Sequence, residues 1–485
     1  MSNATTMNRT ELCEYRLVVL CETVTPLHTG SGEASHVTDA ELRRNAKGQY
    51  IMPGTSIAGA LRTIVERISG VAQTGECRLY TRTDDRDDAL EPCPCAVCRL
   101  FGNVEPGKTA NEHSPVKAFA SKLTVFDAVF ECPRTRVVDG VAINRTRGSA
   151  QDSKKFDYRQ ILPGSKLQIE IRAVNLTTLE LDWISAALRI IARGEVGLGG
   201  RSARGNGFLK PDETKCFIDS RNVHEPDDVL AYVLEKNDSQ KGWGNQVAKQ
   251  LDQFSGNLLS LPNRIGCDFL MAPAPNSGFL ISDPVRTVAT GYDAASRRLD
   301  QKAEIPGSSL TGVLRSGAER IVRTLGGIAC DPVSDRCKKP RCLVCELFGN
   351  EDFASRLAVR VSSKEESREM PFDHVAIDRF TGGASDQKKF DALTMMEGEF
   401  SVHFTIDRAD DPTLANWMIG LLALTLRDLH QGRLWIGKGG SKGNGLFLIT
   451  SEPCWQMPVE WGMNKIELSN CVLALNDEVR KREKS

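Results

Sequence analysis

The sequence predicts an α+β fold made of two tandem ferredoxin-like domains. The chain of 485 residues is longer than one hydrophobic core usually supports, and each half carries strand and helix patterns in the ferredoxin-like order. Four sequence blocks also occur twice in the same order, which indicates a tandem duplication. The block pairs are MPGTSIAGALRTIVERI (52–68) and IPGSSLTGVLRSGAERI (305–321), CAVCRLFGN (95–103) and CLVCELFGN (342–350), VAINRTRGSAQDSKKFD (141–157) and VAIDRFTGGASDQKKFD (375–391), and GEVGLGGRSARGNG (194–207) and GRLWIGKGGSKGNG (432–445).

The repeats divide the chain into a first domain at residues 10–223, a connector at 224–262 and a second domain at 263–485. The connector begins as a polar, acidic segment and continues with a weakly helical pattern. We therefore expect it to belong to neither repeated unit.

Each copy begins with a strand pattern and continues with a helix pattern. Apolar residues alternate over 15–21, as in a strand, and recur with helical spacing over 57–68, after the Pro-Gly turn. Thr55 or Ser56 is expected to cap that helix. Further strands are predicted at 167–176 and 400–406, and apolar helices precede the glycine-rich blocks of both copies.

Composition excludes several classes of protein. Lys plus Arg (62) nearly equals Asp plus Glu (63), so binding to nucleic acid would have to depend on local basic clusters. No apolar run approaches the roughly 20 residues of a membrane span, and the first residues lack the apolar core of a signal peptide. We therefore expect a cytoplasmic protein with no membrane partner.

The cysteines predict one structural zinc site in each copy. Fifteen cysteines without an export signal favour reduced thiols or metal ligands over disulfides. A Cys-x-x-Cys turn supplies two ligands of a tetrahedral zinc site, and four thiolates leave no position open for water. Unliganded thiols are the alternative, and His113 competes for the fourth position in the first copy. The expected ligands are Cys77, Cys93, Cys95, Cys98, Cys330, Cys337, Cys342 and Cys345.

The glycine-rich blocks do not fit a nucleotide-binding loop. A dinucleotide fingerprint needs a strand before its glycines and a helix after them, whereas here the order is reversed. Gly439 also stands where a P-loop carries Ser or Thr. The blocks can bind phosphate through backbone amides and basic side chains, or they can let a helix pack closely on the sheet. We favour the interpretation that the blocks do both, binding phosphate and letting the helix pack closely on the sheet.

A basic segment in each copy predicts a hairpin that follows phosphates. Charge runs of this length are usually only solvated, but here they recur with Gly, Ser and Thr nearby. Neither copy has the aromatic motif with which RNA-recognition-motif sheets stack bases, so backbone contacts are favoured over base reading. The basic residues include Arg145, Lys154, Lys155, Arg379, Lys388 and Lys389.

Five elements in order resemble the repeat-associated mysterious protein (RAMP) superfamily, whose domains are ferredoxin-like (RRM-like). They are the first strand, the PG[ST]S-x-x-G-x-L helix, the CxxC-x-LFG element, the INR/IDR-x-x-G-x-A segment and the terminal glycine loop. More narrowly, each copy is similar to the backbone subunit of type III CRISPR effector complexes. Two fused copies resemble the multi-domain backbone proteins of type III-D-like systems.

The resemblance implies partners and roles. Each copy would grip a CRISPR guide RNA, its hairpin would be a thumb that wedges into the guide-target duplex, and other type III effector subunits would bind alongside. The residues expected to contact RNA are Ser56, Arg62, Arg145, Lys154, Lys155, Arg201, Arg204, Ser309, Arg315, Arg379, Lys388, Lys389, Lys438 and Lys442.

The resemblance also implies that an aspartate between the first strand and the PG[ST]S helix supports Mg²⁺- or Mn²⁺-dependent cleavage of single-stranded target RNA. Asp39 and Asp293 lie within one position of each other when counted back from the Pro-Gly turn. A carboxylate can act there as a base or as a metal ligand. Four arginines follow the aspartates and are expected to stabilise phosphorane charge: Arg43, Arg44, Arg297 and Arg298.

Alternatives stay open for these aspartates and for the function. Asp39 also suits a helix N-cap, and the local rivals are Glu33, Asp283 and Asp300, with His28 and His36 as lower-ranked bases. A non-catalytic guide-RNA scaffold, a guide-processing endonuclease and a metabolic nucleotide-binding enzyme are the competing functions.

Overall fold

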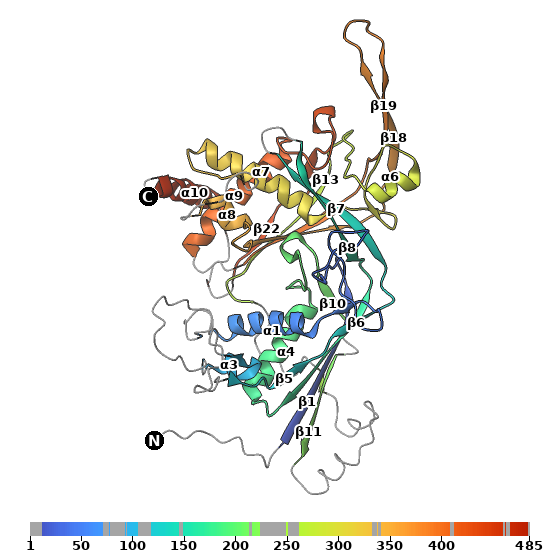
Figure 1. The fold of residues 1–485 in the computed structure, drawn as a ribbon. Coiled ribbons are helices and arrows are strands. Elements are labelled where there is room, and N and C mark those ends of the chain that lie inside the picture. Colours follow the sequence, from blue (N-terminus) through green and yellow to red (C-terminus); the bar gives the residue numbers. More distant parts are fainter. Residues whose placement is uncertain are drawn as a thin grey trace, which may run out of the picture.

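The computed structural model describes residues 12–70, 77, 93, 95–104, 118–144, 149–212, 216–223, 249–250, 261–331, 337, 341–407, 412–458, 461 and 466–483. Its buried apolar side chains form two separate cores, one drawn from residues 17–261 and the other from 265–479. Figure 1 shows the corresponding halves stacked one above the other. We call residues 12–261 the first half and 262–483 the second half. The predicted connector boundaries stay a prediction.

The first half has one antiparallel sheet with two helices on one face. The strand order is β12-β11-β1-β9-β6-β2, and β10 and β5 extend it beside β1 and β9. The elements are β1 (Leu12–Thr23), β2 (Ile51–Met52), α1 (Gly54–Ile68), β5 (Leu123–Val125), β6 (Ala128–Glu131), β9 (Lys166–Val174), α4 (Thr178–Ala192), β10 (Leu209–Pro211), β11 (Phe217–Val223) and β12 (Lys249–Gln250).

The second half repeats this arrangement. Its sheet has the order β17-β20-β13-β21, with β22 beside β13, so the first strand again lies between the third and the last. This is the ferredoxin-like α+β order that the sequence predicts. The elements are β13 (Ile265–Pro273), α7 (Gly307–Thr324), β17 (Leu357–Ser363), β20 (Phe400–Ile406), α9 (Pro412–His430), β21 (Phe447–Ile449), β22 (Cys454–Gln456) and α10 (Leu468–Glu483), which packs on α9.

The helix after each Pro-Gly turn is set by close backbone packing. A Cβ on Gly54 would lie 2.2 Å from the carbonyl oxygen of Val125, so only glycine fits there. Helix α1 begins at Gly54, with Pro53 at the N-cap position and no side-chain cap. The expected cap by Thr55 or Ser56 is therefore wrong, because both residues lie inside the first turn.

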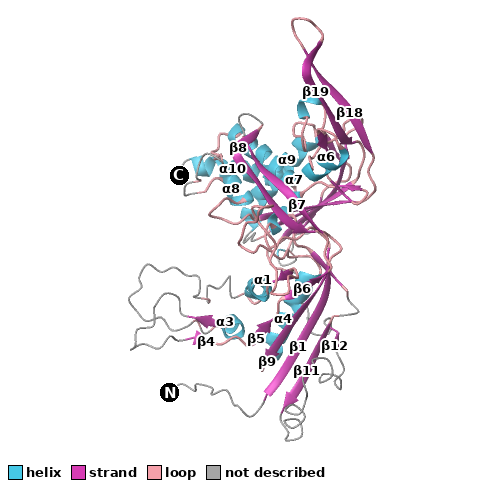
Figure 2. Ribbon diagram, turned by 45° about the vertical axis from the view of Figure 1, so that its right-hand side comes forward, coloured by secondary structure: helices cyan, strands magenta, loops and turns pink. Residues whose placement is uncertain are grey.

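A long β-hairpin extends from each half. The hairpins are β7 (Thr135–Ile143) with β8 (Ala150–Ile161), and β18 (Glu369–Ile377) with β19 (Ala384–Met395). Figures 1 and 2 show β7–β8 running alongside the second half, whereas β18–β19 projects away from the molecule. The duplicated hairpins thus have different neighbours.

The remaining elements are short and lie in the loops and insertions. They are α3 (Ala96–Phe101), β3 (Asn103–Val104), β4 (Ala118–Phe119), the 3-10 helix η2 (Ser202–Arg204), α6 (Pro284–Thr290), β14 (Ala294–Ala295), β15 (Arg298–Leu299), β16 (Lys302–Ala303), α8 (Leu343–Phe348) and the 3-10 helix η5 (Gly440–Lys442).

The two halves meet through the glycine loop of the first half and the helix start of the second. A Cβ on Gly307 would lie 2.4 Å from the carbonyl oxygen of Arg204, and one on Gly205 would lie 2.6 Å from that of Val359. Arg360 donates to the carbonyl of Gly194 at 3.2 Å. Close backbone contact therefore joins the halves here.

A charged cluster joins the hairpin of the first half to the second half. Glu304 bonds to Arg136 of β7 and lies 3.1 Å from Nε of Arg297. Burial alone would raise the pKa of Glu304, but the charges of Arg297 and Arg136 hold that pKa below its ordinary value. At the rim, Arg134 pairs with Asp300 at 2.8 Å.

Candidate functional site

In both halves, the loop that carries the candidate aspartate lies along the hairpin. Ala40 lies opposite Tyr158 in a parallel bridge, and in the second half β14 pairs in parallel with β19, Ala294 opposite Ala392. No helix forms over residues 38–46, so Asp39 is not a helix cap. The loop thus pairs with the hairpin through a single bridge in the first half and through the short strand β14 in the second.

Asp39 and Asp293 make the same contacts in their two halves. The backbone N–H of Asp39 donates to Oδ1 of Asp157 at 2.7 Å, and the N–H of Asp157 donates to Oδ2 of Asp39 at 2.9 Å. Asp293 and Asp391 repeat both bonds, at 2.8 and 2.9 Å. Asp39 and Asp293 are exposed, so a ligand in solvent can reach both carboxylates.

Most of the local rivals have other roles. The carboxylate of Asp283 accepts the N–H groups of Val285 and Arg286 and caps α6, and Asp300 pairs with Arg134. Glu33 is exposed in the same loop as Asp39.

His28 is buried, and His36 is exposed in the loop. Nδ1 of His28 lies 2.7 Å from the carbonyl oxygen of Arg159 and donates to it in the neutral ring. Burial lowers the pKa of His28, so the ring is neutral at pH 7. Because the ring is buried and hydrogen-bonded to the backbone, a packing role is favoured over a role as a base.

The arginines after the two aspartates differ. Arg43 is exposed, and the guanidinium of Arg44 lies 4.0 Å from the ring centre of Tyr50. In the second half, Arg297 is buried against Glu304, and Arg298 pairs with Glu369 at 2.9 Å. Both arginines of the second half are thus paired with protein carboxylates, and the expectation that they stabilise phosphorane charge stays a prediction.

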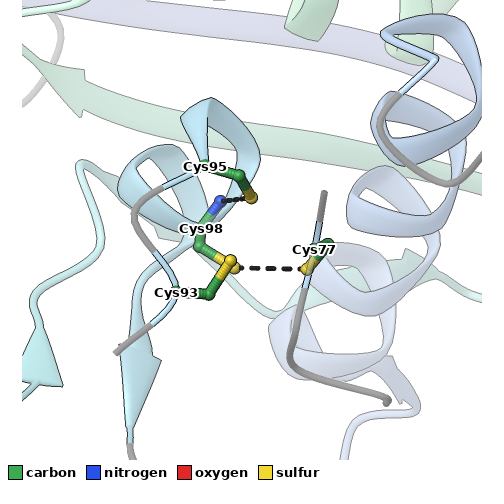
Figure 3. A group of neighbouring side chains, drawn as sticks. All are labelled: Cys77, Cys93, Cys95 and Cys98. Carbon is green, nitrogen blue, oxygen red and sulfur yellow. Dashed lines mark hydrogen bonds between the residues drawn. The ribbon is translucent and has the colours of Figure 1, made fainter. Parts of the chain in front are cut away.

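The eight predicted cysteine ligands form two clusters. Their sulfur atoms lie within 4.8 Å of one another in each set, which fits a single tetrahedral ion. Figure 3 shows the first set, where Cys95 precedes α3 and accepts the N–H of Cys98 at 3.4 Å. Cys342 precedes α8 and accepts the N–H of Cys345 at the same distance. Burial raises the pKa of Cys98, and it raises that of Cys330 to about 12. The hydrogen bond with Cys345 lowers the pKa of Cys342 to about 4.

An arginine from the helix of each half contacts its cysteine cluster. Nη2 of Arg62 lies 3.1 Å from Sγ of Cys98, and Nη2 of Arg315 lies 3.2 Å from Sγ of Cys345. Each guanidinium also donates to a loop carbonyl, at Gly102 or Gly349. Four thiolates around a Zn²⁺ ion would carry a net charge of −2, which these cations would offset. The RNA contacts expected of Arg62 and Arg315 stay a prediction.

The glycine loops hold their shape by packing. A Cβ on Gly207 would lie 1.9 Å from the carbonyl oxygen of Leu198, and one on Gly445 would lie 2.4 Å from that of Ile436. Close backbone contact inside each loop therefore requires glycine at these positions, and both predicted roles, helix packing on the sheet and phosphate binding, stay predictions.

Basic side chains of the glycine loops lie over hairpin aromatics. The guanidinium of Arg201 lies 3.9 Å from the ring centre of Tyr158, and Nζ of Lys442 lies 4.0 Å from that of Phe390. Arg204 and Lys438 are exposed.

The other expected RNA contacts lie mostly on the surface. Lys155 pairs with Asp139 at 2.8 Å, and Lys389 pairs with Asp373 at 3.1 Å. Arg145 lies outside the described residues. Lys154, Lys388, Arg379 and Ser56 are exposed, and Ser309 is half-buried.

The sequence matches the RAMP superfamily over residues 20–210 and 288–447, which is more than half of the chain and includes parts of both halves. The chain belongs to the RAMP superfamily. A relative in Methanocaldococcus jannaschii, named "CRISPR system Cms endoribonuclease Csm3", is 22% identical over 231 residues. The alignment covers 46% of this chain and 85% of the relative, so this RAMP protein is about twice the length of that relative. Among the described helices, none is long and apolar enough to cross a lipid bilayer.

Asp157 and Asp391, the partners of the candidate aspartates, are not among the site residues expected from the sequence. A signal was present, because both matched hairpin blocks end in Lys-Lys-Phe-Asp. Sequence alone did not indicate that the loop joins the hairpin.

Proposed function

We propose that this RAMP protein is a double backbone subunit of a type III CRISPR ribonucleoprotein that binds guide RNA and cuts complementary target RNA at one site in each half. The observation that carries the proposal is the identical aspartate arrangement in two halves whose surroundings differ. The endoribonuclease name of the relative supports the reaction class.

The guide RNA would be held through its phosphates. The exposed basic residues of the hairpins and glycine loops repeat in both halves, which favours contacts to the RNA backbone. Binding should therefore tolerate many guide sequences and weaken steeply with added salt.

Cleavage would proceed by attack of a ribose 2′-hydroxyl on the adjacent phosphorus. The new O–P bond forms a 2′,3′-cyclic phosphate, and the bond to the 5′-oxygen breaks, so that the leaving oxygen takes a proton and becomes a 5′-hydroxyl. Asp39 or Asp293 is exposed where an unpaired nucleotide can approach, and its carboxylate can accept the 2′-hydroxyl proton. Arg43 can contact the phosphate in the first half.

Divalent cations would have two different roles. A structural Zn²⁺ in each cysteine cluster would hold the α3 or α8 insertion. When bound, Mg²⁺ or Mn²⁺ would neutralise phosphate charge at the cleavage sites. Within the described residues, three or more metal-ligating side chains meet only in the cysteine clusters. Asp39 and Asp293 would therefore share such a cation with RNA oxygens and water.

Further effector subunits are the proposed protein partners. In the first half, the glycine loop contacts the start of the helix that follows the second Pro-Gly turn. The corresponding Gly443 of the second half has no atom within 4 Å of an added Cβ among the described residues. We propose that the second loop and hairpin contact another subunit in a similar manner.

The test is to purify the chain with its bound RNA, sequence that RNA, and add a complementary strand with Mg²⁺. The proposal predicts repeat-spacer guides and cleavage of the complementary strand. It predicts at least a roughly 10²-fold slower reaction in the Asp39→Ala/Asp293→Ala double variant, because the proposed bases are gone. Unchanged cleavage in the double variant would remove the aspartates from the mechanism.

A non-catalytic scaffold is the second candidate. The burial of Arg297 and the pairing of Arg298 favour it for the second half, because protein carboxylates already offset the charge of both arginines there. Guide binding without any cut under several divalent cations would select the scaffold.

A further inference from the structure

Asp157 and Asp391 end the repeated Lys-Lys-Phe-Asp segments, and the proposed function gives them no role. We propose that each is a positioning residue that holds the catalytic carboxylate of its half, Asp39 or Asp293, against the hairpin. This inference rests on the proposed function and adds a second residue to each site.

The two bonds of each pair form a closed ring between loop and hairpin. Asp157 receives the N–H of Asp39 on Oδ1 and returns its own N–H to Oδ2 of Asp39. The first bond fixes the backbone of the loop, and the second fixes one oxygen of its carboxylate. Among the described residues, Oδ1 of Asp39 accepts no hydrogen bond, so it is free to meet a substrate. Such preorganisation matters because reacting groups tolerate little misplacement.

The recurrence of the ring argues against coincidence. The residue after the hairpin aspartate is Tyr158 in the first half and Ala392 in the second. Among the described residues, a helix (α6) also lies in the second aspartate loop and not in the first. The two bonds nevertheless recur, with lengths of 2.7 and 2.9 Å in one half and 2.8 and 2.9 Å in the other.

In each hairpin, the positioning aspartate lies opposite a second aspartate whose charge is offset by a lysine. Asp139 lies directly opposite Asp157 across β7 and β8, where two like charges would repel. Lys155 pairs with Asp139 at 2.8 Å. Asp373 lies opposite Asp391 in the same way, and Lys389 pairs with Asp373. The lysine therefore reduces the cross-strand repulsion in both halves.

Because Asp157 is part of the hairpin, the position of Asp39 depends on the position of β7–β8. That hairpin is attached to the second half through Arg136 and Glu304. Hairpin β18–β19, which carries Asp391, projects without such an attachment among the described residues (Figure 1). The positioning contact thus links each hairpin, whether attached to the other half or projecting, to the loop that carries the proposed chemistry.

Three variants separate positioning from charge. Asp157→Ala removes the acceptor of the Asp39 N–H, whereas Asp157→Asn keeps an amide oxygen there and loses only the charge. Asp152→Ala, at an exposed position on the same strand, is the matched control. The guide-loaded chain is assayed for cleavage at each site, for target affinity, and for hydrogen exchange of the backbone amides at 37–43.

The proposal predicts that Asp157→Ala lowers the turnover rate of one cut by roughly 10²-fold, with target affinity unchanged and faster exchange at 37–43. Asp157→Asn should stay within about 3-fold of the unmodified chain, since its amide oxygen accepts the same bond. Asp152→Ala should match the unmodified chain.

Two results would overturn the inference. One is wild-type cleavage and exchange in Asp157→Ala. The other is an equal loss in Asp157→Asn with normal exchange, which would mean that charge matters and position does not. Failure of the proposed function itself looks different, because the unmodified complex would then cut no target at all.

Discussion

The two halves of the molecule share their sheet order, their aspartate pairs and their cysteine clusters, yet they differ in what surrounds them. In the first half, the glycine loop and hairpin lie against the second half. In the second half, β18–β19 projects away from the molecule (Figure 2), and a Cβ added to Gly443 would meet no described atom within 4 Å. Features that stay identical under such different surroundings are set by each half alone, whereas the charged cluster at Glu304 exists only where the halves meet.

The cysteine clusters should show the largest effect, and they should show it equally in both halves. Cys98→Ser and Cys345→Ser each remove one of four ligands, and structural zinc contributes on the order of 10 kcal/mol to folding in small zinc domains. Metal analysis should find two zinc ions per chain and one in either variant. Cys132→Ser, at an exposed cysteine outside the clusters, serves as the control. Two zinc ions in either ligand variant would contradict the assignment.

Glu304→Ala should have the next largest effect on stability. It tests the charged cluster that exists only where the two halves meet. Removing this carboxylate leaves Arg136 and Arg297 buried without their partner, which costs about 3–5 kcal/mol. Chemical denaturation should show this loss, and the exposed Glu365→Ala variant should not. A stability equal to that of the unmodified chain would mean that the cluster does not hold the halves together.

Replacing His28 should have the smallest effect on stability. The effect should be confined to the first half, because Leu280 occupies the corresponding bridge position of the second half. The pKa of folded His28 lies below the unfolded value of about 6.5. Its contribution to stability is therefore present above about pH 6.5 and is lost as the pH falls through the folded pKa.

His28→Leu should lower the pH sensitivity of the first half. Hydrogen exchange in β1 and β9 at pH 7.5 and pH 5 should change less in this variant than in the unmodified chain. An identical pH response in the two proteins would rule out this role of His28.

The sequence predicted those features that depend on repetition or short spacing. The repeats predicted the order of elements and the equivalence of Asp39 and Asp293, and the Cys-x-x-Cys turns predicted both cysteine sets. The contacts made by Asp157 could not be predicted, because they join residues 118 positions apart.

Arg62 and Arg315 show why basic positions on a helix are hard to interpret from sequence. Both follow the Pro-Gly turn, where the family resemblance suggests RNA contact. The fold brings α3 and α8 beside them. Their guanidinium groups therefore meet sulfur atoms that lie 36 positions away in the first half and 30 positions away in the second.

The central claim is that each half of this RAMP protein carries its own cutting site. The most direct measurement maps the cleavage positions on one complementary RNA for the unmodified complex, Asp39→Ala and Asp293→Ala. The account predicts two cut positions for the unmodified complex and the loss of a different one in each variant. Loss of both cuts in either variant, or of neither, would contradict it.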